Sequence, residues 1–318
     1  MPDRGGCNAR PETGTNVETQ HLDELVSFLG TVRIVADTLG GDAFLQPEAK
    51  LERYYKNHAL VYLRALKILQ EAVPPETPLK VLELGAAPYF FTALLKTYLP
   101  CELTAVSVPV GTWPGAPLRA RKESVKLQAG KIPRQFDIEV HVLNIEKDPF
   151  PFPDNSFDLV LCMEVIEHLT YSPSQMLAET HRVLTQGGKL LITVPNAINI
   201  KRTVQLLVNE TIEHRYSGYG VYGRHNREYA PRELEALLAA CNYEVVLLQT
   251  ANVWREIARG SSARRLANVL LNALTSVPVP YLWAKREYVF ALAEPVGEPR
   301  ASYPGFLYDF RHGYASWT

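Results

Sequence analysis

Histidine and glutamate side chains occur in two short stretches whose spacing suits acid–base chemistry. One stretch is Glu164-Val165-Ile166-Glu167-His168, and the other is His225-Asn226-Arg227-Glu228-Tyr229. An imidazole accepts a proton near neutral pH and can therefore remove one from a hydroxyl acceptor. We predict His225 as the first candidate for this general base and His168 as the second. The alternative for each is a structural hydrogen bond, and for His168 it includes capping a turn together with Glu167.

Arginine and tyrosine side chains are gathered around His225. The stretch from 213 to 229 has neither helical nor strand periodicity and is too polar for a core element. We therefore predict a lid over residues 197–230. Guanidinium groups bind phosphate, and tyrosine rings among arginines suit the ring faces and hydroxyls of sugars. The lid is expected to hold a small-molecule or glycan acceptor through Arg224, Arg227, Tyr229 and Tyr222.

A strand, a turn and a helix are predicted upstream of both stretches. The apolar run Val81-Leu82-Glu83-Leu84 breaks at Gly85, continues through Ala86-Ala87-Pro88, and restarts as an aromatic-rich amphipathic segment. In open α/β sheets such a turn lies at the carboxyl edge of the first strand, where N–H groups of the following helix meet ligands. The pattern predicts that this turn holds a nucleoside-containing cofactor.

Segments with strand and helix patterns alternate through the rest of the chain. After 81–84, strands are expected near 103–108, 138–143, 157–162, 190–194, 243–248 and 287–292. Helices are expected near 89–98, 174–184, 231–240 and 263–274, with a further basic helix over 119–128. Such alternation predicts an α/β fold with a doubly wound, mostly parallel, seven-stranded Rossmann-like sheet and right-handed crossovers.

The N-terminal part of the chain differs in composition from the rest. Residues 1–20 are polar and lack an apolar core, so we predict a disordered tail there. Residues 21–77 carry two apolar stripes at helical spacing, which predict an N-terminal helical extension. Within it, Tyr54, Tyr55 and His58 could line a substrate pocket, although aromatic residues on a helix face are more often packing residues.

The overall composition bears on the partners and the compartment of the protein. The formal net charge of −1 gives no electrostatic signature for nucleic acid, so no nucleic-acid partner is expected. The four cysteines have neither metal-ligand nor disulfide spacing, which favours the cytoplasm. Residues 266–284 are apolar but contain prolines, so at most peripheral membrane contact is expected. The sequence shows no metal site, although acidic side chains from distant loops could assemble one.

Four motifs in the same order resemble those of one family. They are Glu83-Leu84-Gly85, the run 150–158, the run 164–169, and His181-Arg182-Val183-Leu184 followed by Gly187-Gly188 and Pro195-Asn196. From about residue 81 to 248 the chain resembles a class I S-adenosylmethionine-dependent methyltransferase, of the branch with ubiquinone-type and small-molecule enzymes. The resemblance implies S-adenosyl-L-methionine as cofactor and S-adenosyl-L-homocysteine as product. It also implies a methyltransferase domain over 78–297, followed by a tail over 298–318.

The resemblance further implies which residues would contact the cofactor. Gly85 would allow the backbone to approach the methionine part, and Glu83 would orient the amino group. Asn144 and Ile145 would meet the adenine, and Glu164 would border the space between methyl donor and acceptor. The complete implied set is Glu83, Gly85, Ala86, Ala87, Ser107, Asn144, Ile145 and Glu164.

Two departures from the family pattern bear on cofactor affinity. Where the family has further glycines, this chain has Ala86 and Ala87, which fit only if φ is negative there. Where the family has an acidic residue that grips both ribose hydroxyls, this chain has Ser107, which can contact one. A non-catalytic scaffold with a degenerate methyltransferase fold is therefore an alternative to an enzyme.

The acceptor is the least defined part of the sequence-based prediction. The C-terminal run from Tyr303 to Asp309 resembles the ends of some bacterial methyltransferases of polysaccharide or glycolipid synthesis. We therefore expect O-methylation of a small-molecule or sugar-like acceptor, as in carbohydrate or natural-product biosynthesis, with N- or C-methylation of a metabolite as the nearest rival. A homo-oligomer is compatible with the sequence.

Overall fold

Helices and strands alternate along most of the chain, as the hydrophobic patterns predict. The computed structural model describes residues 15–37, 48–73, 78–107, 120–213, 216, 223–253, 262–277, 279–305 and 307. The helices are α1 (Thr15–Leu29), α2 (Glu48–Ala72), α3 (Phe90–Tyr98), the 3₁₀ helix η1 (Ile166–His168), α4 (Ser174–Val183), α5 (Ile200–Leu207), α6 (Pro231–Ala240), α7 (Ser262–Ser276) and α8 (Pro280–Trp283). The strands are β1 (Arg33–Asp37), β2 (Leu79–Leu84), β3 (Cys101–Val106), β4 (Arg121–Ala129), β5 (Arg134–Val142), β6 (Phe157–Met163), β7 (Leu184–Pro195), β8 (Tyr243–Ala251) and β9 (Tyr288–Pro295).

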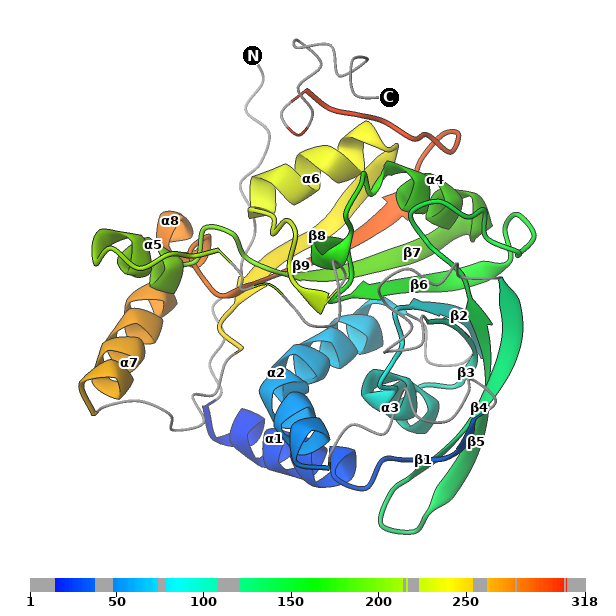
Figure 1. Cartoon of the computed structure of the whole chain (residues 1–318), viewed down its shortest axis with the longest axis horizontal. Coiled ribbons are helices and arrows are strands. Elements are labelled where there is room, and N and C mark those ends of the chain that lie inside the picture. Colours follow the sequence, from blue (N-terminus) through cyan, green and yellow to red (C-terminus); the bar gives the residue numbers. More distant parts are fainter. Residues whose placement is uncertain are drawn as a thin grey trace.

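The strands form one mixed sheet, in the order β1-β4-β5-β3-β2-β6-β7-β9-β8 (Figure 1). The five central strands, from β5 to β7, are parallel to one another, and the strands outside them pair antiparallel. Along the chain these five strands run outward from β2 in one direction and then, from β6, in the other. The strand order therefore reverses between β2 and β6, which is the position where doubly wound sheets bind ligands.

The sheet has nine strands among the described residues, so the predicted number of seven is wrong. One additional strand is β4, where a basic helix was expected. Val125, Leu127 and Ala129 are buried, and the lysines between and before them are exposed, which is the period of a strand. β4 pairs antiparallel with β5, and Lys122 forms an ion pair with Glu139 across the two strands. The positive charges that suggested a solvated helix face lie instead on the exposed face of a hairpin.

The other additional strand, β1, lies between the two N-terminal helices. Helices α1 and α2 contain the apolar stripes that predicted them, but α1 already begins at Thr15, within the predicted disordered tail, because a helix extends beyond the apolar stripe that anchors it. β1 pairs antiparallel with β4 at the edge of the sheet. Leu25 of α1, Leu69 of α2 and Leu94 of α3 belong to one hydrophobic cluster. The N-terminal region thus contributes to the sheet and to its core, and is not a purely helical addition.

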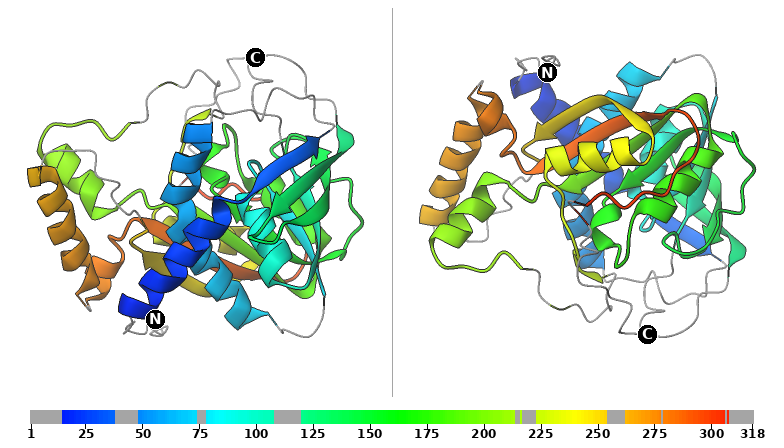
Figure 2. Two further views of the ribbon diagram at one scale, coloured as in Figure 1. Left: turned by 90° about the horizontal axis from the view of Figure 1, so that it is seen from below. Right: turned by 90° about the horizontal axis from the view of Figure 1, so that it is seen from above.

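Helices cover the sheet on both faces, as Figure 2 shows from two opposite sides. Val81 of β2 packs in the cluster formed with α1, α2 and α3, whereas the next residue, Leu82, packs in the cluster formed with α4 and α6. Successive side chains of a strand point to opposite faces, so this alternation places β2 at the centre of two cores. The carboxyl end of β2 is thereby held from both sides.

Helices α5, α7 and α8 lie together to one side of the sheet (Figure 1). Their apolar side chains are largely exposed, with Leu207 at 77% and Val269 at 63%. Among the described residues, helix length and hydropathy together rule out a helical span of a bilayer. The exposed apolar side chains of α7 and α8 lie in the segment 266–284, for which the sequence predicted at most peripheral membrane contact, whereas those of α5 lie outside it.

Candidate active site

Four predicted site residues come together at the carboxyl edge of the sheet, where the strand order reverses. Glu83 lies near the end of β2, and Ser107, Asn144 and Glu164 directly follow or closely follow β3, β5 and β6. Leu84 of β2 is in register with Val106 of β3 and Cys162 of β6, so these ends meet at one level. Parallel neighbours bring their carboxyl ends to one edge, and this is why segments far apart in sequence meet here.

The turn after β2 is held by a close contact and by its backbone conformation. Gly85 has φ +70°, and a Cβ at this position would lie 2.4 Å from Cγ2 of Val165. Ala86 and Ala87 are not among the residues with positive φ, as their side chains require, whereas Tyr89 has φ 66° at the N-cap of α3. Glycine is therefore needed at position 85 both for its φ and for its contact with Val165.

Glu83 has a buried carboxyl group beside this turn. Its side chain accepts a hydrogen bond of 2.6 Å from Oγ1 of Thr92 in α3. Burial raises the pKa of Glu83 to about 8, although the Thr92 hydrogen bond lowers it in part. The carboxyl group is thus largely protonated at neutral pH and would become ionised beside a cationic group.

The predicted adenine and ribose contacts also have structural roles. Ser107 is buried, and its backbone N–H donates to the carbonyl of His141 over 3.0 Å. Oδ1 of Asn144 accepts a hydrogen bond from the backbone N–H of Glu146. The backbone N–H of Asn144 donates to Oδ2 of Asp148. Ile145 is half-buried against the cluster under α4 and α6. These bonds fix the loop after β5 at the edge of the sheet.

Glu164 follows β6 in a left-handed backbone conformation, with φ 56°. Its carboxylate accepts hydrogen bonds from Oη of Tyr288 at 2.7 Å and Oγ1 of Thr193 at 3.0 Å. Burial raises the pKa of Glu164 to about 7, against the effect of both hydrogen bonds. A non-glycine residue with this φ is costly and is often found at functional sites. Tyr288 and Thr193 carried no signal in the sequence, because they lie within buried strands.

His225 reaches the site because its segment is bonded to η1. The backbone N–H groups of Asn226 and Arg227 both donate to the carbonyl of Glu167. Nδ2 of Asn226 also donates to the carbonyl of His168, over 2.8 Å. These main-chain bonds attach residues 223–229 of the predicted lid to the end of β6, and so bring His225 to His168.

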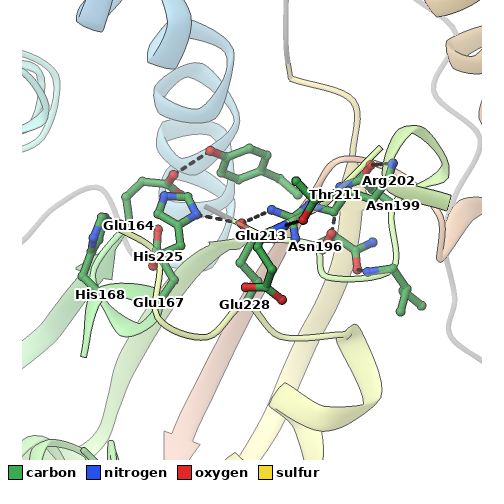
Figure 3. A network of polar contacts seen from close by, with 12 residues as sticks. Glu164, Glu167, His168, Asn196, Asn199, Arg202, Thr211, Glu213, His225 and Glu228 are labelled. Atoms are coloured by element: carbon green, nitrogen blue, oxygen red, sulfur yellow. Dashed lines mark hydrogen bonds and ion pairs between the residues drawn. The ribbon is translucent and has the colours of Figure 1, made fainter. Parts of the chain in front are cut away.

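The two histidine rings contact each other edge to face, with 4.9 Å between their centroids. Nδ1 of His168 is 3.0 Å from the carbonyl oxygen of Arg224, and Nδ1 of His225 is 2.7 Å from Oε1 of Glu228. Both acceptors are oxygens, so each Nδ1 carries the proton and each Nε2 carries the lone pair. Glu228 is in turn paired with Arg202 of α5. Figure 3 shows His168, Glu167, His225 and Glu164 gathered at one place.

Glu167 is the most deeply buried member of this group. Its side chain has 0% exposure, and neither carboxylate oxygen has a hydrogen-bond partner among the described residues. Oε1 lies 4.0 Å from Nε2 of His168. Burial holds the pKa of Glu167 well above its usual value, and the nearby carboxylates of Glu164 and Glu228 raise it further. The sequence had suggested Glu167 only as a capping residue.

The predicted substrate-binding residues differ in their contacts and in their exposure to solvent. The guanidinium of Arg224 lies 5.0 Å from the ring centroid of Tyr216. Arg227 pairs with Glu233 at 3.1 Å and lies over the ring of Tyr229. Tyr229 is 2% exposed and packs within the core under α4 and α6. Tyr222 lies outside the described residues.

Helix α2 adds aromatic groups that face the carboxylates. Tyr54 and His58 are stacked, with 4.2 Å between ring centroids, and Tyr54 and Tyr62 share a hydrogen bond. Burial raises the pKa of Tyr54 to about 12, and the charges of Glu83 and Glu164 contribute to the rise. These side chains, which the sequence placed as packing residues first, therefore lie near the site as well as in the core.

The central part of the chain matches a known domain family. Residues 82–192 match the family model of the methyltransferase domain. A protein of Mycolicibacterium smegmatis, described as a probable S-adenosylmethionine-dependent methyltransferase, is 34% identical over 95 residues, 30% of this chain and 32% of that protein. Over this central part the chain is therefore similar to S-adenosylmethionine-dependent methyltransferases.

Other similar proteins match the chain over different lengths. An uncharacterized protein of Methanocaldococcus jannaschii is 50% identical over 46 residues, 14% of this chain and 20% of that protein. The chain therefore spans less than a third of the length of these two curated relatives. A solved methyltransferase of Archaeoglobus fulgidus has a TM-score of 0.48 at 13% identity, covering 77% of this chain and 98% of that one. A putative methyltransferase of Haloferax volcanii, solved in complex with the activator Trm112, has a TM-score of 0.47 at 14% identity, covering 83% of this chain and 100% of that one.

Proposed function

We propose that the protein is an S-adenosylmethionine-dependent O-methyltransferase that acts on a small-molecule or sugar-like acceptor in the cytoplasm. The observation that carries this proposal is that Glu83, near the end of β2, and the histidine pair, beyond the end of the neighbouring parallel strand β6, belong to the same edge of the sheet. When bound, S-adenosylmethionine supplies a sulfonium methyl group, whose C–S bond breaks as the bond to the acceptor oxygen forms. Sulfur keeps the electron pair, and the acceptor loses its hydroxyl proton.

The residues of the edge fit such a cofactor. The buried carboxyl group of Glu83 can pair with its ammonium group, and the turn from Gly85 to Ala87 would lie against its methionine part. Ser107 would bond one ribose hydroxyl, and Asn144 and Ile145 would border the adenine. Ala86 and Ala87 have the negative φ that this turn requires of residues with a Cβ, so their presence does not distort it.

The histidine pair supplies the group that takes the acceptor's proton. The hydrogen bond from Nδ1 of His225 to Glu228 leaves the lone pair on Nε2 and favours the imidazolium that forms when Nε2 is protonated. His168 has the same orientation through the carbonyl of Arg224. A proton acceptor is needed for an oxygen acceptor but not for a tertiary amine, and this favours O-methylation over the nearest rival, N-methylation.

Calorimetric titration with S-adenosylhomocysteine tests the cofactor assignment. We expect saturable binding with one equivalent per chain, because Glu83 and the turn after β2 are both arranged to receive it. The alternative is a scaffold that retains the fold without the cofactor. Absence of any binding heat at millimolar ligand would reject the enzyme and leave the scaffold.

Cofactor binding is also expected to depend on pH through Glu83. The pKa of Glu83 is about 8 in the free protein. A bound ammonium group would lower this pKa, so binding releases a proton below pH 8 and affinity rises with pH, by up to about tenfold per pH unit. Titrations in buffers of different ionisation enthalpy would measure the released proton. Glu83→Gln keeps an acceptor for Thr92 but cannot ionise, so its affinity should lose this part of the pH dependence; an equal slope in the variant would contradict the role of Glu83.

A further inference from the structure

Glu167, His168 and His225 direct three potential metal ligands toward one point. The two imidazole nitrogens and a carboxylate oxygen all lie within 4.8 Å of one another. Two residues come from η1 and the third comes from the segment that main-chain bonds attach to η1. We propose that these three side chains bind one divalent transition-metal ion.

The hydrogen bonds around the two histidines orient them as ligands. Metal-bound histidines usually donate their other ring N–H to a carboxylate or a backbone carbonyl, which fixes the tautomer and the direction of the ring. Here Nδ1 of His168 faces the carbonyl of Arg224, and Nδ1 of His225 faces the carboxylate of Glu228. Both Nε2 atoms therefore present lone pairs to the same region.

The carboxylate of Glu167 supplies the second, independent observation. It is fully buried, has no hydrogen-bond partner among the described residues, and faces Nε2 of His168 at 4.0 Å. A buried carboxylate is normally paired, hydrogen-bonded or bound to a metal. A cation between this carboxyl group and the two imidazoles would give the Glu167 oxygens the partner that they lack among the described residues.

The ligand types favour some ions over others. Two imidazoles and one carboxylate suit Zn²⁺, Co²⁺, Mn²⁺ or Fe²⁺, whereas Mg²⁺ prefers oxygen ligands only. Three protein ligands leave at least one position open, as in catalytic metal sites. An ion here would occupy the Nε2 lone pairs of both histidines, and it would then promote loss of the acceptor's proton in their place by lowering the pKa of the acceptor hydroxyl. This role rests on the proposed methyl transfer, but the binding of the ion does not.

Titration of the full chain with Co²⁺ after treatment with EDTA tests the proposal. The d–d absorption of Co²⁺ reports its ligands directly, and Zn²⁺ competition reports the affinity for a second ion. We expect one equivalent of Co²⁺ per chain, displaced by Zn²⁺. Glu167→Gln and His225→Gln should each weaken binding by at least about tenfold, and His181→Gln, which alters a histidine bonded to the carbonyl of Val296, should bind as the parent does.

A second variant guards against loss of folding. Glu228→Gln leaves all three ligands in place but removes the charge of the carboxylate that accepts from His225 and pairs with Arg202, and it should weaken Co²⁺ binding by about 10–100-fold. Absence of saturable binding in the parent, or equal affinity in the folded variants of positions 167, 225 and 228, would overturn the proposal. The titration contains no S-adenosylmethionine, so a failure to bind Co²⁺ leaves the cofactor assignment intact, and a failure to bind S-adenosylhomocysteine leaves the metal site intact.

Discussion

Replacement of His225 by alanine is expected to lower turnover by about 10²–10⁴-fold, the usual contribution of a positioned general base. The reason is local, because a ring nitrogen of His225 lies within 4.8 Å of a carboxylate oxygen of Glu167 and of a ring nitrogen of His168, at the edge where donor and acceptor would meet. The same loss is expected if His225 acts as a metal ligand. Single-turnover kinetics with S-adenosylmethionine and a hydroxyl acceptor would measure it.

Cofactor affinity should separate this effect from a general disturbance. Glu83, which we assign to the cofactor, is held by Thr92 of α3, whereas His225 is held by Glu228 and by the attachment of its segment to η1. His225→Ala should therefore bind S-adenosylhomocysteine with nearly the affinity of the parent. If the variant turns over as fast as the parent, His225 neither removes the proton nor holds an ion that does so.

Replacement of Gly85 by alanine is expected to lower the free energy of unfolding by about 2–5 kcal/mol. A left-handed backbone costs an L-residue about 1–2 kcal/mol, and an overpacked core costs about 1–3 kcal/mol more. Both apply, because Gly85 has φ +70° and a Cβ there would lie 2.4 Å from Cγ2 of Val165. Urea unfolding followed by circular dichroism would measure the change.

Gly187 offers a matched control for this measurement. It has φ +78°, but a Cβ at this position would have no neighbour within 4 Å. Gly187→Ala should therefore lose only the backbone part, about 1–2 kcal/mol. Equal losses at the two positions would show that Val165 moves aside and that the contact with Gly85 is not restrictive.

The sequence predicted the centre of the fold better than its edge. Strands β2, β6 and β7 are buried on both faces over most of their length, so their apolar runs are nearly continuous. β4 was mistaken for a helix because its lysines and arginine dominate the pattern, whereas Val125 and Leu127 show the strand period only once β5 is known to pair with it. Local sequence carries little information on such pairing.

The site was predicted in its residue types more than in its arrangement. His168, His225 and Glu164 stand out because polar residues follow apolar strands or fill a long loop. The partnership of His225 with Glu167 could not be predicted, because it depends on backbone N–H groups of Asn226 and Arg227 that any sequence possesses. The position of Tyr54 near Glu164 likewise depends on how α2 crosses the sheet.

Residues 223–229 are attached to η1 through backbone atoms, whereas the chemistry of the site depends on side chains. The bonds that hold this segment end on the carbonyl of Glu167, while the carboxylate of the same residue points into the histidine pair. A substitution at position 167 can thus change the side chain beside the two histidines without breaking the main-chain bonds that attach residues 223–229 to η1. During evolution, the side chain at position 167 can therefore change, and with it the chemistry of the site, while the backbone carbonyl of the same residue continues to hold residues 223–229.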